Sequence, residues 1–411
     1  MEIEESIQDG LNHVRMLVDT IGKRPTGFAG ERRAAQYLCE QLQSWGLVDV
    51  GTEPFAARSW DFEVCRLESG AMEPIEGLPV EFSKSTPPGG LEAELLVYES
   101  PDHVRVGEMA GKIVLVYGGM LADEVLLEGK PAGFIQVTDN PKAHQFIYGP
   151  KRPLAGKLPM LTLGHDDGVE LIKRGVERLV LHIETTIQDV EGLNVVGTLP
   201  AAAGGERRIN ISSHYDSVPA SGAAGDNATG AACALEVVHA LSRTPLEATV
   251  DLVVFSAEEI GLYGSAAYAE AHAEQLAGTE VGIYFDGQGD FLGRHNIHIA
   301  GQDGLVELVR DLIGEIDYRA NVNQGFTGVD TACLSALGLP NLWFQRGPQL
   351  TWHTRDDISE DVSPRAMRES IHAAVQIARH VAAHPGCFPG GLPDNQMKEA
   401  RDYMAGGAPV W

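Results

Sequence analysis

The chain lacks the features that mark several classes of protein. No stretch approaches the about 20 apolar residues that a membrane-spanning helix needs. The start, Met-Glu-Ile-Glu-Glu, lacks the basic and apolar leader of a secretory signal, so we expect a cytoplasmic protein with no membrane partner. Lys and Arg form no cluster, and the formal net charge is -27. Phosphate binding needs clustered cations, so the composition argues against a nucleic-acid partner.

Cysteine is scarce, and no CxxC pair is present. The five cysteines are widely scattered, at Cys39, Cys65, Cys233, Cys333 and Cys387. An odd and scattered set is typical of reduced thiols that pack in a core. The sequence therefore gives no support to a zinc site built from cysteine.

Length and composition predict a globular protein with two domains. The 411 residues are 44% hydrophobic and 22% charged, and their number exceeds the about 100 to 200 residues of one ordinary core. We expect one domain over residues 1–56 and 188–384, an inserted domain over 57–187, and a Gly- and Pro-rich tail over 385–411.

The segment 57–187 consists of short β-rich runs separated by turn residues, and we expect an inserted module without chemistry. Typical runs are Gly111-Lys-Ile-Val-Leu-Val-Tyr-Gly118 and Gly133-Phe-Ile-Gln-Val-Thr-Asp-Asn-Pro141. The polar residues His144, His165, Asp166 and Asp167 are isolated here, and residues of this kind are more often solvated than bound to a metal.

After about residue 190, strands alternate with loops and helices, which predicts a mostly parallel sheet covered by helices. Sites in such sheets lie at the carboxyl ends of the strands. The strand Arg208-Ile-Asn-Ile-Ser-Ser-His214 ends in His214, and Asp216 follows two residues later. A carboxylate at this spacing can accept the second imidazole N–H and orient the ring.

Four more metal-capable residues stand in similar places. Glu258 and Glu259 follow the apolar strand 249–256, Asp286 ends the strand 281–285, and His353 lies in Thr351-Trp-His-Thr-Arg-Asp-Asp357. Asp226, in Gly225-Asp-Asn-Ala-Thr-Gly230, has the pattern of a helix cap when it is considered alone. Its position between the other candidates favours a metal ligand. In the adjacent pair, the Glu259 carboxylate can bind a metal ion while the Glu258 carboxylate faces the metal-bound water.

These motifs resemble peptidase family M28, the zinc aminopeptidases and carboxypeptidases, in the family's order. The matching pieces are His214-Tyr-Asp216, Gly225 to Gly230, Ser256-Ala-Glu-Glu-Ile-Gly-Leu-Tyr-Gly-Ser265, Phe285-Asp286, His353 to Asp357 and the opening Lys23-Arg-Pro-Thr-Gly-Phe-Ala-Gly30. The middle segment resembles the protease-associated domain that is often inserted in these enzymes, at Gly111 to Gly119 and Leu158 to Leu163.

The resemblance implies an α/β zinc-exopeptidase fold and two zinc ions per chain. Asp226 would bridge the ions, with His214 and Asp286 completing one ligand set and Glu259 and His353 the other. Glu258 would take a proton from a water between the ions and pass it to the departing amine, and Asp216 would orient His214. The family also implies a cis peptide bond between Asp226 and Asn227.

Two departures from the family pattern concern the substrate. Phe326 stands where several members place an oxyanion-supporting tyrosine, and Gly287 and Gln288 follow Asp286 in place of the more usual Met and Gly. Phe326 and Trp352 are candidates for an apolar substrate pocket.

Three functions are compatible with the motifs. The first is a dizinc aminopeptidase acting on peptides. The second is a carboxypeptidase or amidohydrolase acting on a dipeptide or small amide, and Arg346 or Arg355 could hold a substrate carboxylate. The third is a binding protein that has lost catalysis, against which the intact Glu258 argues. The oligomeric state is not readable from the sequence.

Overall fold

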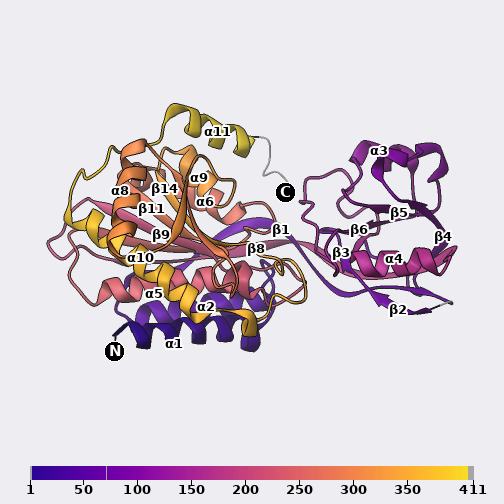
Figure 1. Ribbon diagram of the computed structural model, residues 1–411, viewed down its shortest axis with the longest axis horizontal. Coiled ribbons are helices and arrows are strands. Elements are labelled where there is room, and N and C mark those ends of the chain that lie inside the picture. Colours follow the sequence, from indigo (N-terminus) through magenta and orange to yellow (C-terminus); the bar gives the residue numbers. More distant parts are fainter. Residues whose placement is uncertain (1, 71, 406–411) are drawn as a thin grey trace. The chain divides into compact units, whose positions relative to one another are not determined.

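A computed structural model describes residues 2–70 and 72–405 (Figure 1). The chain divides into two compact units, one formed by residues up to Ala57 together with those from Val190 onward, and one formed by Arg58–Asp189. No helix among the described residues is both long and apolar enough to cross a membrane.

The larger unit is built on a seven-stranded part of the sheet, in the order β13-β12-β14-β11-β9-β10-β8. The four strands β10, β9, β11 and β14 are parallel neighbours, while β8 and β12 flank them in antiparallel pairing. The bounds are β8 (Arg178–Leu199), β9 (Arg208–His214), β10 (Thr249–Phe255), β11 (Thr279–Phe285), β12 (Arg294–Ala300), β13 (Ala320–Gln324) and β14 (Asn341–Gly347). The expected α/β fold with a mostly parallel central sheet is confirmed.

Helices cover both faces of this sheet, because alternate residues of each strand point to opposite sides. In β10, Val250, Leu252 and Val254 join one apolar core, whereas Val253 and Phe255 join another. The first core contains residues of α1 (Glu2–Arg15), α2 (Ala29–Ser44), α5 (Thr229–Ser242), α8 (Asp303–Glu315) and α10 (Pro364–Ala383). The second contains residues of α6 (Tyr263–Ala271), α7 (Ala273–Ala277) and α9 (Thr331–Ala336). A π-helical turn, Met16–Ile21, continues α1.

Part of the segment expected as a tail is helical. Helix α11 (Asp394–Ala405) packs against α9, and Arg401 Nε donates to the Ala336 carbonyl oxygen at 3.0 Å. Tyr403 and Met404 of α11 lie against the second core. Residues 406–411 lie outside the described residues.

The smaller unit has its own sheet and core. Strands β4 (Leu91–Tyr98), β5 (Ile113–Tyr117), β6 (Gly133–Val137) and β7 (Met160–Leu163) are parallel, and β3 (Leu78–Pro79) pairs antiparallel with β7. The unit also contains helices α3 (Asp123–Gly129) and α4 (His165–Lys173), and the hairpin of β1 (Val48–Ser69) with β2 (Met72–Glu76). Strands β1 and β8 extend across the boundary between the units, so the smaller unit interrupts the larger one in sequence.

Candidate metal centre

The candidate ligands meet at the carboxyl ends of the four central parallel strands. His214 ends β9, Glu259 follows β10, Asp286 follows β11, and His353 lies in the loop after β14. Parallel neighbours bring their carboxyl ends to one edge of a sheet, which is why residues so distant in sequence converge. Asp226 joins them from the turn before α5.

Two groups of side chains have the geometry to hold a metal ion, and Asp226 belongs to both. His214, Asp226 and Asp286 form one group, and Asp226, Glu259 and His353 form the other, with the ligand atoms of each within 4.8 Å of one another. His214 Nε2 is 3.3 Å from Asp226 Oδ1 and 3.6 Å from Asp286 Oδ1. His353 Nε2 is 3.2 Å from Asp226 Oδ2 and 3.0 Å from Glu259 Oε2. Each carboxylate oxygen of Asp226 therefore faces a different group.

Asp226 does not cap α5. The cap position of this helix is Ala228, without a side-chain hydrogen bond, and Asp226 has the non-helical angles φ −125° and ψ 84°. The helix-cap interpretation of this residue is therefore wrong. The Asp226–Asn227 peptide bond is cis, as the family resemblance implied.

The donor atoms suit a transition metal. His214 is fully buried, and its Nε2 forms no well-aligned hydrogen bond although two carboxylate oxygens lie 3.3 and 3.6 Å away. A buried nitrogen that faces carboxylates without a hydrogen bond is the arrangement expected of a metal ligand. Imidazole nitrogen together with carboxylate oxygen is a ligand set that zinc accepts. The residues present therefore fit the expected metal.

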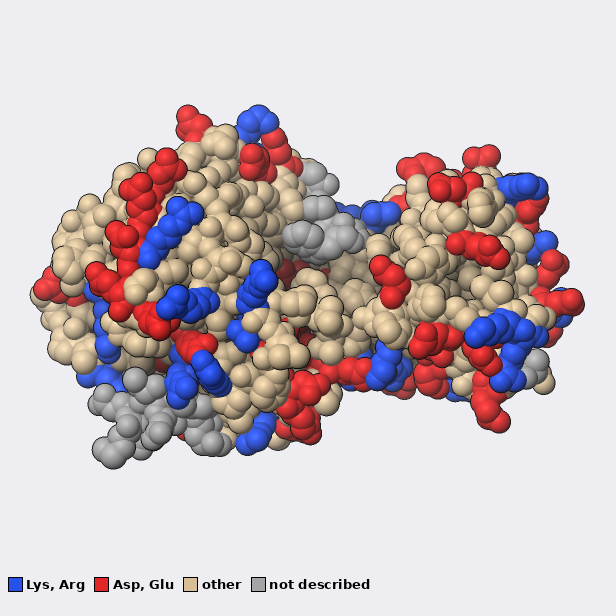
Figure 2. Space-filling view, in the orientation of Figure 1, with Lys and Arg blue, Asp and Glu red and all other residues tan. Residues whose placement is uncertain are grey.

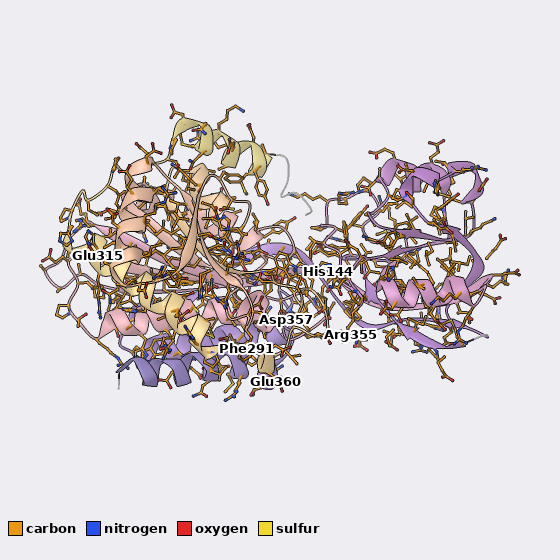
Figure 3. The ribbon with its side chains drawn as sticks, in the orientation of Figure 1. His144, Phe291, Glu315, Arg355, Asp357 and Glu360 are labelled. Atoms are coloured by element: carbon orange, nitrogen blue, oxygen red, sulfur yellow. The ribbon has the colours of Figure 1, made fainter. Side chains whose placement is uncertain are left out.

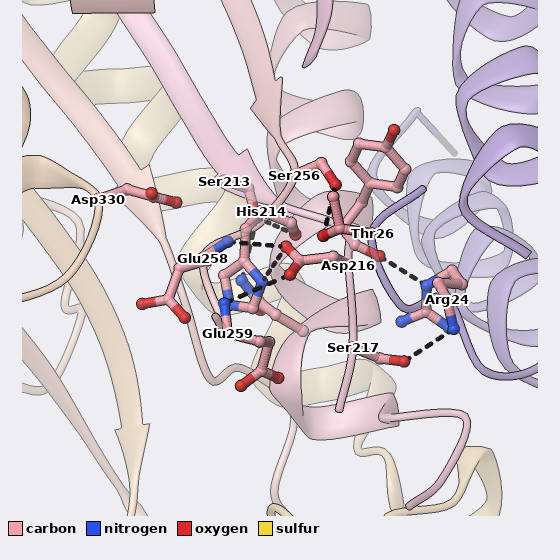
Figure 4. A network of polar contacts seen from close by, with 12 residues as sticks. Arg24, Thr26, Ser213, His214, Asp216, Ser217, Ser256, Glu258, Glu259 and Asp330 are labelled. Carbon is pink, nitrogen blue, oxygen red and sulfur yellow. Dashed lines mark hydrogen bonds and ion pairs between the residues drawn. The ribbon is translucent and has the colours of Figure 1, made fainter. Parts of the chain in front are cut away.

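Asp216 connects the ligands to the candidate base. Its Oδ1 lies 3.4 Å from His214 Nδ1, and its two oxygens accept the backbone N–H groups of Glu258 at 3.2 Å and Glu259 at 3.3 Å (Figure 4). One buried carboxylate thus holds the backbone of both glutamates next to the imidazole. This role of Asp216 toward the Glu258–Glu259 turn was not visible in the sequence.

Glu258 belongs to neither ligand group and stays partly exposed. Burial raises the pKa of its carboxyl well above the ordinary value, the nearby His214 opposes this shift, and Asp330, Asp286 and Glu259 add to it. The raised pKa increases the proton affinity of the Glu258 carboxylate, which suits a general base.

Asp357 and Asn227 hold the turn that carries Asp226. Asp357, labelled in Figure 3, accepts the backbone N–H groups of Gly225 at 2.6 Å and Asp226 at 3.1 Å. Asn227 Nδ2 donates to Ser213 Oγ and to the Phe285 carbonyl oxygen, so the turn is tied to β9 and β11. Both residues lie in motifs that matched the family, but their types alone did not indicate these contacts.

Arg24 is a fully buried cation beside the site. Its guanidinium donates to five backbone carbonyl oxygens, those of Leu17, Gly22, Tyr215, Gly222 and Ala223. Burial lowers the pKa of Arg24 to about 10, while Asp216 opposes the shift. The loop that leads from His214 to Asp226 is therefore held by a residue of the N-terminal segment.

Of the two candidate pocket residues, Trp352 contacts a metal-capable group and Phe326 packs on α11. Trp352 is 41% exposed and stacks on the His353 ring, with the centroids 5.4 Å apart. Phe326 packs edge-on against Tyr403 of α11, also with centroids 5.4 Å apart, and the Tyr403 hydroxyl donates to the Gly328 carbonyl oxygen. Their part in a pocket stays a prediction.

Comparison with known proteins agrees with this geometry. Residues 194–378 match the model of peptidase family M28. Carboxypeptidase Q of Mus musculus is 28% identical over 367 residues, which are 81% of this chain and 74% of that protein. Aminopeptidase YwaD of Bacillus subtilis (strain 168) is 28% identical over 291 residues, 66% of this chain and 60% of that protein. The structure of BSAP, a zinc aminopeptidase from Bacillus subtilis, superposes with a TM-score of 0.76 at 21% identity and covers 95% of this chain and 98% of its own.

The family match, the peptidase relatives and the two ligand groups together support a metallo-exopeptidase. The part of the chain that matches peptidase family M28, residues 194–378, contains both ligand groups.

Proposed function

We propose that the protein is a dizinc aminopeptidase. The observation that carries this proposal is the division of Asp226 between two ligand groups, one oxygen to each. A carboxylate shared in this way is suited to bridge two ions. His214 and Asp286 would hold one ion with Asp226, and Glu259 and His353 the other.

Two residues of this chain would assist the reaction: Glu258 transfers protons, and Asp216 positions Glu258. When bound, zinc supplies Lewis-acid activation of water and of the scissile carbonyl group. Glu258 accepts the proton of the attacking water on its carboxylate and then donates it to the amine that leaves. Asp216 holds the backbone N–H of Glu258, which keeps the base in place during both transfers.

The charge of the site favours a substrate ammonium group over a substrate carboxylate. Seven carboxyl side chains gather in and around the ligand groups, namely Asp216, Asp226, Glu258, Glu259, Asp286, Asp330 and Asp357. The buried cation, Arg24, already donates to five backbone carbonyl oxygens. Asp226, Glu259 and Asp286 would be neutralised by the zinc ions, so the partners left for an N-terminal ammonium are the carboxyl groups outside the two ligand groups, and their excess supports an aminopeptidase.

A carboxypeptidase is the second candidate, because the relative carboxypeptidase Q matches over 81% of the chain. Arg346 Nε donates to the Asp290 carbonyl oxygen at 2.7 Å, so this part of its guanidinium is engaged. Arg355 is exposed on the segment that follows His353 (Figure 3).

Metal analysis together with a substrate panel tests both candidates. Metal content per chain is measured by elemental analysis, and hydrolysis is followed with aminoacyl amides, N-acetylated dipeptides and free dipeptides, before and after chelation. Two zinc equivalents and chelator-sensitive cleavage of aminoacyl amides support the aminopeptidase. Cleavage of N-acetylated dipeptides without cleavage of aminoacyl amides supports the carboxypeptidase and contradicts our first proposal.

We further propose that the smaller unit, Arg58–Asp189, is an insertion of the protease-associated type that takes no part in the chemistry. Both metal-capable groups found among the described residues lie in the larger unit. Deletion of such a module should change substrate choice or stability while leaving the metal content unchanged.

A further inference from the structure

An unpaired hydrogen-bond donor lies beside the metal-capable groups. The side-chain nitrogen of Gln349, Nε2, is buried and has no hydrogen-bond partner in the described part of the chain. A buried amide nitrogen normally finds an acceptor in the protein or in a bound molecule. A bound substrate could supply the acceptor that this nitrogen lacks among the described residues.

The carboxamide of Gln349 lies directly over Gly287, the residue that follows Asp286. A Cβ atom at position 287 would be 1.9 Å from Gln349 Nε2, so the amide fills the space of a side chain there. The backbone of Gly287 is fixed on both sides, because its N–H donates to Asn227 Oδ1 and its carbonyl oxygen accepts the Arg346 N–H. The amide thus lies against the residue that follows Asp286, a candidate ligand of the first group.

The same amide is close in sequence to a ligand of the second group. Along the loop after β14, exposure alternates: Pro348, Leu350 and Trp352 are exposed, whereas Gln349, Thr351 and His353 are less so. Leu350 is 72% exposed, and His353 is 8% exposed. Gln349 consequently faces the protein, as His353 does, while its neighbours form the open surface of the loop.

Three other side chains, Phe326, Tyr403 and Tyr284, offer no free hydroxyl donor. Phe326 has no hydroxyl, the Tyr403 hydroxyl donates to Gly328 O at 2.5 Å, and the Tyr284 hydroxyl donates to Asp330 Oδ2 at 3.0 Å. Gln288 also has an unpaired amide nitrogen, but its amide oxygen accepts the hydroxyl of Ser370 on α10, which directs that side chain toward the helix.

We propose that Gln349 Nε2 donates a hydrogen bond to the oxygen of the scissile carbonyl group as that oxygen gains negative charge. Gln349 thereby supplies the donor that Phe326 does not. The inference rests on the proposed peptidase function and adds a substrate-binding residue to it. A donor aimed at a developing oxyanion stabilises the transition state more than the bound substrate, so its effect falls on kcat.

The test compares two Gln→Met variants in the holoenzyme, with an aminoacyl amide as substrate. Gln349→Met keeps the volume but removes the donor, and we expect kcat to fall by about 100-fold with KM changed by less than about threefold. Gln345→Met is the matched control, because Gln345 lies on β14 and its oxygen accepts Asn296 Nδ2 away from the ligands. This control should keep kcat within about threefold of the wild type.

A second substitution provides a rescue. Phe326→Tyr in the Gln349→Met background should raise kcat by about tenfold or more over that of Gln349→Met alone. The proposal is overturned if Gln349→Met keeps kcat within about threefold, or if its kcat falls together with its metal content. Wild-type activity and metal content decide the proposed function separately, since they do not depend on either Gln variant.

Discussion

In the proposed function, Glu258 is the side chain on which the proton transfers depend. Glu258→Gln keeps the size of the side chain but cannot accept a proton, so kcat should fall by about 1,000-fold. The metal content should stay at the wild-type value, because Glu258 belongs to neither ligand group. Steady-state kinetics and elemental analysis of the same preparation measure both quantities. Glu274→Gln, on exposed α7, is the control, and equal losses in the two variants would contradict the role of Glu258.

Asp357 holds the turn that carries Asp226 and so would act on metal binding indirectly. Asp357→Asn replaces one carboxylate oxygen by an NH2 group, so either the Gly225 N–H or the Asp226 N–H loses its acceptor. We expect zinc affinity to weaken by about 10- to 100-fold, because partners of metal ligands usually contribute this much. Competition with a chelator of known affinity measures the change. Asp356→Asn is the neighbouring control, and an unchanged zinc affinity in Asp357→Asn would refute the assignment.

At the scale of secondary-structure elements, Arg24 joins the N-terminal segment to the loop between β9 and α5. Arg24→Met removes the donors for five backbone carbonyl oxygens. Unpaired buried carbonyl groups are costly, so the free energy of unfolding should fall by about 3 kcal/mol or more. Denaturant unfolding at a fixed zinc concentration measures the loss. Arg32→Met, on the exposed side of α2, should change it by less than about 0.5 kcal/mol.

The elements that carry the ligands could be predicted from the sequence, because β9, β10 and β11 are short apolar runs with a polar residue at or just after their ends. The mostly parallel pairing also follows from the alternation of strands and helices, although the order of the strands does not. The supporting contacts could not be predicted. Arg24 and Asp357 act across 191 and 132 residues of sequence, and nothing local distinguishes them from ordinary surface charges.

The helix α11 and the loop at Gln349 were also beyond sequence reasoning. The segment 385–411 is rich in Gly and Pro, which is typical of a tail, yet Asp394–Ala405 forms a helix whose Tyr403 packs on Phe326. Packing against α9 outweighs the composition of the surrounding segment. Gln349 approaches Gly287 because the loops after β14 and β11 lie side by side. Hydrophobic periodicity predicts strands and helices but not such a contact between two loops.

At the scale of the whole molecule, acidic residues dominate the charge. Asp and Glu number 58 against 31 Lys and Arg, and the visible face in Figure 2 shows the basic side chains interleaved with acidic ones. This surface agrees with the absence of any basic run in the sequence. Carboxyl groups are also in excess around the buried ligand groups, where they affect the stability of the metal-free protein.

Metal removal should destabilise the protein, and more so at higher pH. Without metal, burial raises the pKa of Glu259 to about 7, and Asp226 adds to the shift. Burial alone would lower the pKa of His353, but Glu259 and Asp226 outweigh it and raise that pKa well above the ordinary value. Both groups favour folding when protonated, so their contribution is lost as the pH rises through these pKa values.

Zinc binding requires deprotonated ligands, so its stabilising effect grows over the same range. The Tm difference between the zinc-loaded and chelated protein should therefore be larger at about pH 8 than at about pH 5.5. Differential scanning calorimetry at both pH values, in the same salt, measures it. A difference that is constant or shrinks toward pH 8 would contradict the ionisation of the ligand groups described above.

The spread of the ligands along the chain also bears on how the protein is made. His214, Asp226 and Asp286 leave the ribosome well before His353, which completes the second group, and Asp357, which holds the turn of Asp226. In the proposed dizinc centre, all residues of the first ligand group are therefore synthesised before the second group is complete. The second group gains its last member only when the final quarter of the polypeptide is being translated.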